Sequence, residues 1–149
     1  MIENYEINES TLAVIPLSKN ESLVMEEEES YTVLQNTTTI LDNSCRFFGS
    51  SYLGRHMGTQ ALIGTKYKTP IIVEESKNLI FFPTSSPKKS LCYWISLNHV
   101  KNYEKNGENT QLTFKNGKKI TLNVSKYAIE NQILRASRLD SVLTKRKAM

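Results

Sequence analysis

The stretch that decides the fold runs from Gln111 to Val124 and reads QLTFKNGKKITLNV. Polar and apolar residues alternate on both sides of Asn116-Gly117, the dipeptide most typical of a two-residue hairpin turn. Because side chains alternate between the two faces of a strand, the apolar residues fall on one face. They are Leu112, Phe114, Ile120, Leu122 and Val124. The pattern predicts an antiparallel β-meander that leaves Lys115 and Lys119 exposed beside the turn.

A long helix is expected directly after this hairpin. Ser125 is a good N-cap, and apolar residues recur at helical spacing from about Lys126 to Leu143. The apolar stripe comprises Ala128, Ile129, Ile133, Ala136, Leu139 and Leu143. The opposite side carries Asn131, Arg135, Arg138 and Lys145, where solvent exposure and phosphate contact are equally good interpretations. Meander and helix together predict an α+β fold.

Residues before the hairpin predict further short strands, bounded by turn residues. The expected strands are Tyr5–Ile7, Thr11–Ile15, Leu23–Met25, Tyr31–Leu34, Pro70–Val73, Leu79–Phe82, Cys92–Leu97 and Val100–Tyr103. They extend the antiparallel β-meanders over most of the chain.

The stretch from Ser44 to Thr59, SCRFFGSSYLGRHMGT, has a different character. Asp42, Asn43 and Ser44 are all candidate N-caps for a single helical turn. Glycines at 49, 54 and 58 then predict an irregular, glycine-rich basic loop. A helix-turn-helix is not expected, because no adjacent pair of helices with a short turn is apparent.

Charge is distributed unevenly along the chain of 149 residues, whose net charge is +4. Residues 1–42 carry nine acids and one base, whereas residues 43–149 carry eighteen bases and six acids. We therefore expect an acidic β-rich segment, 1–42, that forms one domain with a basic DNA-binding body, 43–149. Such a body attracts polyanions.

The composition argues against export and membrane insertion. No apolar run approaches 18 residues, and the start MIENYEINES is acidic where a secretory signal is basic. Cys45 and Cys92 are therefore read as reduced thiols of a cytoplasmic protein.

Motifs for catalysis or metal binding are weak. The stretch Gly49-Ser50-Ser51 near His56 could suggest a nucleophile and a base, but no residue marks an orienting acid or an oxyanion hole. The spacings of Cys45, His56, Cys92 and His99 match no common zinc module. Neither an enzyme nor a bound metal or cofactor is expected.

Nucleic-acid binding accounts better for the basic residues interleaved with aromatic residues. Arginines on a glycine-rich loop would suit a narrow A·T-rich minor groove, where the negative potential is deepest. Arg46 and Arg55 are the candidates for groove reading, and the remaining candidate contacts are Ser50, Ser51, Tyr52, His56, Lys66, Lys68, Lys115, Lys118, Lys119, Arg135 and Arg138. Cys45, Phe47 and Phe48 are expected to anchor the loop to the core. The alternative is a protein-interaction module without DNA contact.

Several ordered blocks resemble one family. Ser44 to Thr59, Phe81-Phe82-Pro83-Thr84, Trp94-Ile95-Ser96 and Phe114-Lys115-Asn116-Gly117-Lys118 closely resemble the bacterial competence transcription factor family, ComK. The resemblance also takes in Pro70–Val73, His99-Val100-Lys101 and Glu130-Asn131-Gln132.

That resemblance implies an activator of DNA-uptake genes that binds paired A/T-rich boxes, largely through the minor groove. It also implies a nucleoid-associated protein, homodimers that pair into a tetramer on DNA, and control by the adaptor MecA with ClpC and ClpP. The acidic first forty residues match the family only loosely.

Overall fold

The computed structural model describes residues 1–88 and 92–149, and its elements form an α+β fold, as predicted. The strands are β1 (Thr11–Ser18), β2 (Glu21–Glu26), β3 (Ser30–Val33), β4 (Ile71–Glu74), β5 (Leu79–Pro83), β6 (Trp94–Ser96), β7 (Val100–Asn106), β8 (Asn109–Phe114) and β9 (Lys119–Leu122). The helices are α1 (Thr37–Phe47), α2 (Tyr52–Ile63), α3 (Lys126–Lys147) and the short 3-10 helix η1 (Leu97–His99).

Two antiparallel sheets organise the molecule. The six-stranded sheet has the order β3-β2-β1-β6-β5-β4, and the smaller sheet has the order β7-β8-β9. In the larger sheet, β1–β3 and β4–β6 are two meanders joined where Ala13 pairs with Ile95 and Val14 with Trp94. Strands of the acidic N-terminal segment and of the basic body therefore share one sheet.

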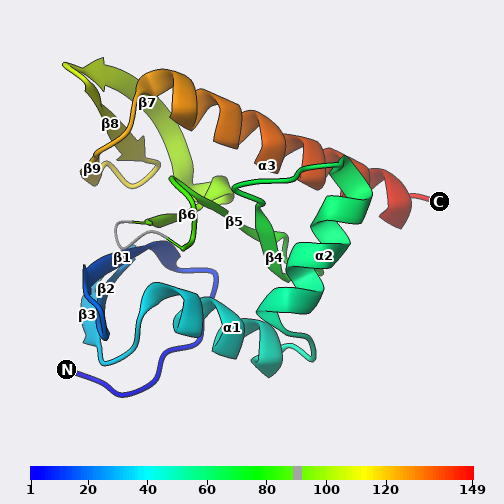
Figure 1. Ribbon diagram of the computed structural model, residues 1–149, viewed down its shortest axis with the longest axis horizontal. Helices are drawn as coiled ribbons and strands as arrows, with labels where there is room; N and C mark the ends of the chain where they lie inside the picture. Colours follow the sequence, from blue (N-terminus) through cyan, green and yellow to red (C-terminus); the bar gives the residue numbers. More distant parts are fainter. Residues whose placement is uncertain (89–91) are drawn as a thin grey trace.

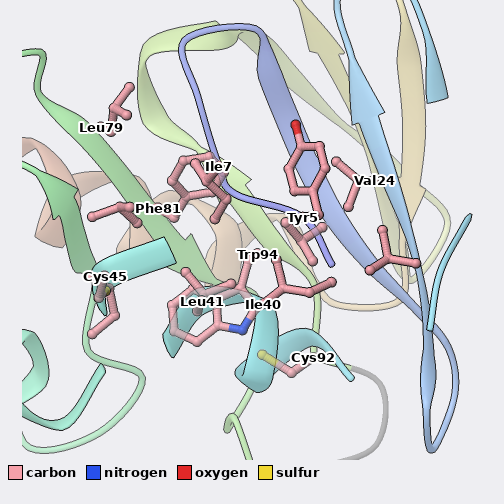
Figure 2. Close-up of a cluster of buried hydrophobic side chains, with 14 residues drawn as sticks. Tyr5, Ile7, Val24, Ile40, Leu41, Cys45, Leu79, Phe81, Cys92 and Trp94 are labelled. Atoms are coloured by element: carbon pink, nitrogen blue, oxygen red, sulfur yellow. The ribbon is translucent and has the colours of Figure 1, made fainter. Parts of the chain in front are cut away.

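The six-stranded sheet has a core on each face because its residues alternate. In β5, Leu79 and Phe81 belong to one buried cluster, and Ile80 and Phe82 belong to the other. Figure 2 shows the first cluster, in which Ile40, Leu41 and Cys45 of α1 meet Phe81 and Trp94 of the sheet. The second cluster joins the sheet to β8 and to the apolar stripe of α3. In Figure 1, α3 runs along the top of the molecule and α1 along the bottom.

The predicted meander and C-terminal helix are confirmed. Leu112, Phe114 and Leu122 are buried, whereas Lys115 and Lys119 are exposed beside the turn. The side chain of Ser125 accepts a hydrogen bond from the amide of Ala128, so it caps α3 as expected. The other predicted strands are present except Tyr5–Ile7, which pairs with no strand; Tyr5 and Ile7 are nevertheless buried.

The prediction of one helical turn followed by an irregular loop is wrong. The helix α1 begins at Thr37, because the side-chain oxygen of Asn36 accepts a hydrogen bond from the amide of Thr39 at 2.8 Å. Asp42, Asn43 and Ser44, taken as caps from the sequence, lie inside this helix. Only the connection from Phe48 to Ser51 is not helical, and Gly49 adopts φ 87° there.

The helix α2 forms across Gly54 and Gly58 because its ends are capped and one side is buried. Ser51 Oγ accepts a hydrogen bond from the amide of Gly54 at 3.0 Å, and Gly64 ends the helix in the left-handed conformation. Thr59 and Ile63 are buried. This tertiary burial outweighs the poor helix propensity of glycine. Since α1 and α2 are adjacent helices with a short connection, the reason given for dismissing a helix-turn-helix is also wrong.

Within residues 1–88 and 92–149, no helix combines the length and apolarity needed to cross a membrane.

Candidate nucleic-acid interface

A groove lies beside α2 and gathers several of the candidate contacts. Its volume is about 780 Å³. The described residues that line it are Thr38, Tyr52, Leu53, His56, Lys66, Tyr67, Lys68, Ser86, Pro87 and Lys88. We call it the α2 groove. It combines three lysines with two tyrosines and a histidine, and none of these lining residues carries a carboxylate.

Two other hollows of the surface contrast with the α2 groove in charge. One, of about 340 Å³, is lined in part by Glu9 and Lys77, which form an ion pair at 3.2 Å. The second, of about 420 Å³, lies at the start of α3 and includes Glu108. The sequence around α2 also lacks acids, with no Asp or Glu from Asn43 to Val73. An acid-free basic surface suits a polyanionic ligand better than either hollow does.

Asp42 fixes the start of α2 against α1. Its two carboxylate oxygens accept hydrogen bonds from Arg46 Nε at 2.8 Å and from the amide of Tyr52 at 2.9 Å. The hydrogen bond from Arg46 is the main cause that lowers the pKa of Asp42, and the amide of Tyr52 adds to it. One carboxylate therefore sets where the first residue of α2 lies.

Tyr52 forms part of the wall of the α2 groove. Its ring meets the buried Trp94 edge-on, with centroids 6.0 Å apart, and stacks on His56 at 5.9 Å. Burial is the main cause that raises the pKa of Tyr52 to about 12. The side chain is consequently a neutral phenol at physiological pH.

The helix α3 bonds to the loop that contributes Lys66, Tyr67 and Lys68 to the groove. Gln132 is buried, and its Nε2 donates to the carbonyl oxygens of Lys68 at 2.8 Å and Pro83 at 2.7 Å. Arg135 Nη1 donates to Gln132 Oε1 at 2.8 Å and to the carbonyl oxygen of Tyr67 at 3.2 Å. These bonds position the loop that carries Lys66 and Lys68. The sequence suggested Arg135 as a phosphate contact, and in the structure its Nη1 also bonds to this loop.

Other candidates near α2 lie outside the lining of the groove. Arg46 is exposed at the end of α1 and paired with Asp42, and Ser51 caps α2. Ser50 is half-buried in the connection between the helices. Arg55 is half-buried, and its Nε has no hydrogen-bond acceptor among the described residues.

The lysines of the β8–β9 turn form a separate basic region. Lys118 Nζ donates to the carbonyl oxygen of Glu26 at 2.9 Å, and Asn116 Nδ2 donates to that of Glu27 at 3.1 Å. The turn is thus attached to the backbone of the acidic segment. Lys115 and Lys119 stay exposed beside it. Arg138 is exposed on α3 and is not part of either region.

Two expectations about the Ser44–Thr59 segment need correction or comment. Phe47 is 66 % exposed and does not anchor the segment. The ring of Phe48 packs edge-on against the ring of Phe47 and contacts the core. Cys45 is buried as expected.

Desolvation raises the pKa of Cys45 to about 12 and that of Cys92 to about 11, so both are thiols at physiological pH. In the described parts of the chain, no three His, Cys, Asp or Glu side chains cluster as a metal site.

Sequence reasoning missed two members of this region. Lys88 was not among the candidate contacts, although it follows soon after the buried strand β5 and lines the α2 groove. Gln132 lies among apolar positions of the α3 stripe. A buried amide in such a stripe signals that backbone groups need partners there.

Comparison with known proteins defines the class to which this basic α+β domain belongs. The family model described as ComK protein matches residues 2–148. The competence transcription factor of Bacillus subtilis strain 168 is 39% identical over 140 residues, which cover 91% of this chain and 73% of that protein. No solved structure matches. The chain therefore belongs to the ComK family. It is a transcriptional regulator of competence and not an enzyme.

Proposed function

We propose that this protein activates competence genes by binding A/T-rich double-stranded DNA, and that the α2 groove is its principal DNA contact. The observation that carries the proposal is that the described residues lining the groove include no acid, while Lys66, Lys68 and Lys88 accompany Tyr52 and Tyr67. Lysines neutralise phosphates and release counterions, which supplies much of the affinity for DNA.

Tyr67 is the most exposed aromatic side chain of the groove, at 78 %. An exposed ring between two lysines offers a flat apolar surface to sugars or bases, while the lysines hold the backbone on both sides. The bonds from Gln132 and Arg135 keep this loop in place before DNA arrives. Such preorganisation lowers the entropic cost of binding.

Sequence preference in this proposal comes from the minor groove. Arg46 lies at the end of α1 and Arg55 in the first turn of α2. A narrow A·T-rich minor groove attracts arginine through its deep negative potential. The pair between Arg46 and Asp42 is exposed, so it is weak and can exchange for a phosphate or a groove contact. Lys115 and Lys119 add phosphate contacts that do not depend on the DNA sequence. Further phosphate contacts come from Lys118, Arg138, Ser50 and Ser51.

The assembly and control of the protein complete the proposal. Homodimers pair into a tetramer on paired A/T boxes, the protein is nucleoid-associated, and its level is set by a MecA and ClpC proteolytic system. Residues 1–42 act with the basic body as one domain, and the shared sheet supports this.

A binding titration tests both the DNA contact and the groove it uses. Three duplexes are compared by fluorescence anisotropy: an A·T box, its G·C counterpart, and a copy in which inosine·cytosine replaces A·T. Inosine·cytosine lacks the amino group that G·C places in the minor groove, but its major groove resembles that of G·C. We expect tight binding to the first and third duplexes and weak binding to the second. Equal affinity for all three would refute sequence preference, and loss of binding to the inosine duplex would refute minor-groove reading.

A further inference from the structure

Phe47 is an exposed phenylalanine at the corner between α1 and α2. Of the five phenylalanines in the chain, Phe81, Phe82 and Phe114 are buried and Phe48 is half-buried, whereas Phe47 is 66 % exposed. Its ring carries no polar atom, so exposure forgoes the stabilisation that burial of an aromatic side chain gives. Figure 1 shows this corner at the lower edge of the molecule.

The ring of Phe47 is held in a fixed position by its neighbours. The ring of Phe48 packs edge-on against it, with centroids 5.0 Å apart and planes at 90°, and Phe48 itself packs against the core. The amides of Phe48 and Ser50 both donate to the carbonyl oxygen of Cys45, at 3.1 and 3.0 Å, which orders the connection after Phe47. A single exposed apolar residue is common on protein surfaces, but one backed by a second ring on an ordered turn is preorganised to enter an apolar space.

The surroundings of Phe47 favour DNA over a protein as the partner. Arg46 precedes it, and the sequence from Asn43 to Val73 contains no acid. Asp42 is the nearest acid in sequence, and it still accepts the hydrogen bond from the amide of Tyr52 when Arg46 leaves it for DNA. Tyr52 also lines the α2 groove, so the corner and the groove belong to one basic surface. Such a surface attracts a polyanion.

Proteins that bind the minor groove often combine arginines with an apolar wedge that enters between two base pairs and disrupts their stacking. Pyrimidine–purine steps unstack most easily, and in A·T-rich DNA the pyrimidine–purine step is TpA. We propose that Phe47 inserts between the two base pairs of a TpA step, with Arg46 in the minor groove beside it. Phe47 is then a specificity-determining residue, because it selects a step by the ease with which that step unstacks. This inference rests on the proposed function, to which it adds the kind of step that binding selects.

Affinity for two boxes of equal composition tests the selection. One A·T box contains a central TpA step, and in the other this step is reversed to ApT. Phe47→Ala should weaken binding to the TpA box by about tenfold, the size of effect that loss of one stacked aromatic ring has, and should weaken binding to the ApT box much less. Tyr127→Ala is the control, because it removes an exposed aromatic ring from the start of α3, beside Glu108. It should change neither affinity. Fluorescence anisotropy measures all four.

Permanganate oxidation reports the insertion directly, because permanganate attacks thymines whose stacking is disrupted. The full chain at saturation should make the thymines of the TpA step severalfold more reactive than they are in the free duplex. Phe47→Ala, at a concentration that also saturates the duplex, should leave them as unreactive as in free DNA. Phe47→Leu keeps an apolar wedge and should retain most of the increase. Since Phe47 is exposed, these variants should fold, and their thermal midpoints check this.

The insertion and the proposed function fail in different ways. Unchanged thymine reactivity in a saturated complex, or an increase that Phe47→Ala leaves intact, would overturn the insertion alone and leave recognition to the arginines. Equal losses of affinity for the TpA and ApT boxes would likewise overturn the selection of a step by Phe47. A full chain that does not bind the A·T box at all would remove the proposed function, and the insertion with it.

Discussion

The α2 groove and the β8–β9 turn are both rich in lysine, but the structure uses their lysines differently. Lys66 and Lys68 lie on a loop whose backbone is hydrogen-bonded by side chains of α3, and aromatic side chains lie beside them in the groove. At the turn, Lys118 instead bonds to the backbone of the acidic segment, and only Lys115 and Lys119 project freely among these three. Positive charge therefore has two roles in this molecule: it lines a groove in one place and fastens two parts of the chain in the other.

The largest expected difference between the two regions is in DNA affinity. Lys66→Gln with Lys68→Gln should weaken binding to an A·T box roughly a hundredfold, because two charged contacts of about 1.5 kcal/mol each are lost. Lys115→Gln with Lys119→Gln removes the same charge and should weaken binding only severalfold, equally for A·T and G·C duplexes. Anisotropy titrations at several salt concentrations measure both. Equal losses for the two double variants would remove the distinction between groove and turn.

The loop of the groove should depend on a single buried amide. Gln132→Ala leaves the carbonyl oxygens of Lys68 and Pro83 without their donor, so the free energy of unfolding should fall by about 2 kcal/mol. Urea unfolding measures this, and DNA affinity should fall as well because the loop loses its support. Asn131→Ala, at the preceding position of α3, is the control and should change neither quantity. A Gln132→Ala protein as stable as the control would contradict the role of this residue.

The attachment of the turn should contribute less. Lys118→Met keeps the length of the side chain but removes the bond to the carbonyl oxygen of Glu26. We expect the free energy of unfolding to fall by about 1 kcal/mol. Lys119→Met makes the same replacement at the exposed neighbouring position and should be neutral. If the two variants have equal stabilities, Lys118 is a solvent-exposed charge like Lys119 and does not fasten the turn.

The smallest expected effect concerns Asp42, which holds the start of α2. Its pKa is lowered in the folded protein, so its charge stabilises the fold above the usual carboxyl pKa of about 3.9 and stops doing so as the pH falls through the lowered value. Asp42→Asn should therefore lower the thermal midpoint slightly at pH 7. The difference from the unchanged protein should shrink as the pH falls through the lowered pKa of Asp42 and vanish below it, as thermal unfolding at a series of pH values would show. A difference that persists in acid would mean that the charge is not the cause.

Much of the fold could be predicted because local signals and burial agree. The hairpin around Asn116-Gly117 and the capped helix after Ser125 have unambiguous patterns, and both are present. The α2 region could not be predicted, because Gly54 and Gly58 favour a loop locally while the burial of Thr59 and Ile63 favours a helix. Only the tertiary packing decides between these two tendencies.

The sequence predicted which residue types form the candidate site, but not which of these residues lie together in the structure. The sequence identifies Lys66, Lys68 and Lys118 equally as bases, since charge is visible in sequence and its partners are not. What separates them are bonds between distant parts of the chain, such as that from Gln132 to Lys68 and that from Lys118 to Glu26. Phe47 was misplaced for the same reason, because an aromatic residue is ordinarily a core residue until its surroundings are known.

The most direct test of the central claim is amide hydrogen exchange of the full chain, measured with and without a saturating A·T-box duplex. The account predicts that protection on binding is strongest from Tyr52 to Lys68, with weaker protection from Lys115 to Lys119. Protection confined to the β8–β9 turn, with none from Tyr52 to Lys68, would contradict the assignment of the α2 groove as the DNA contact.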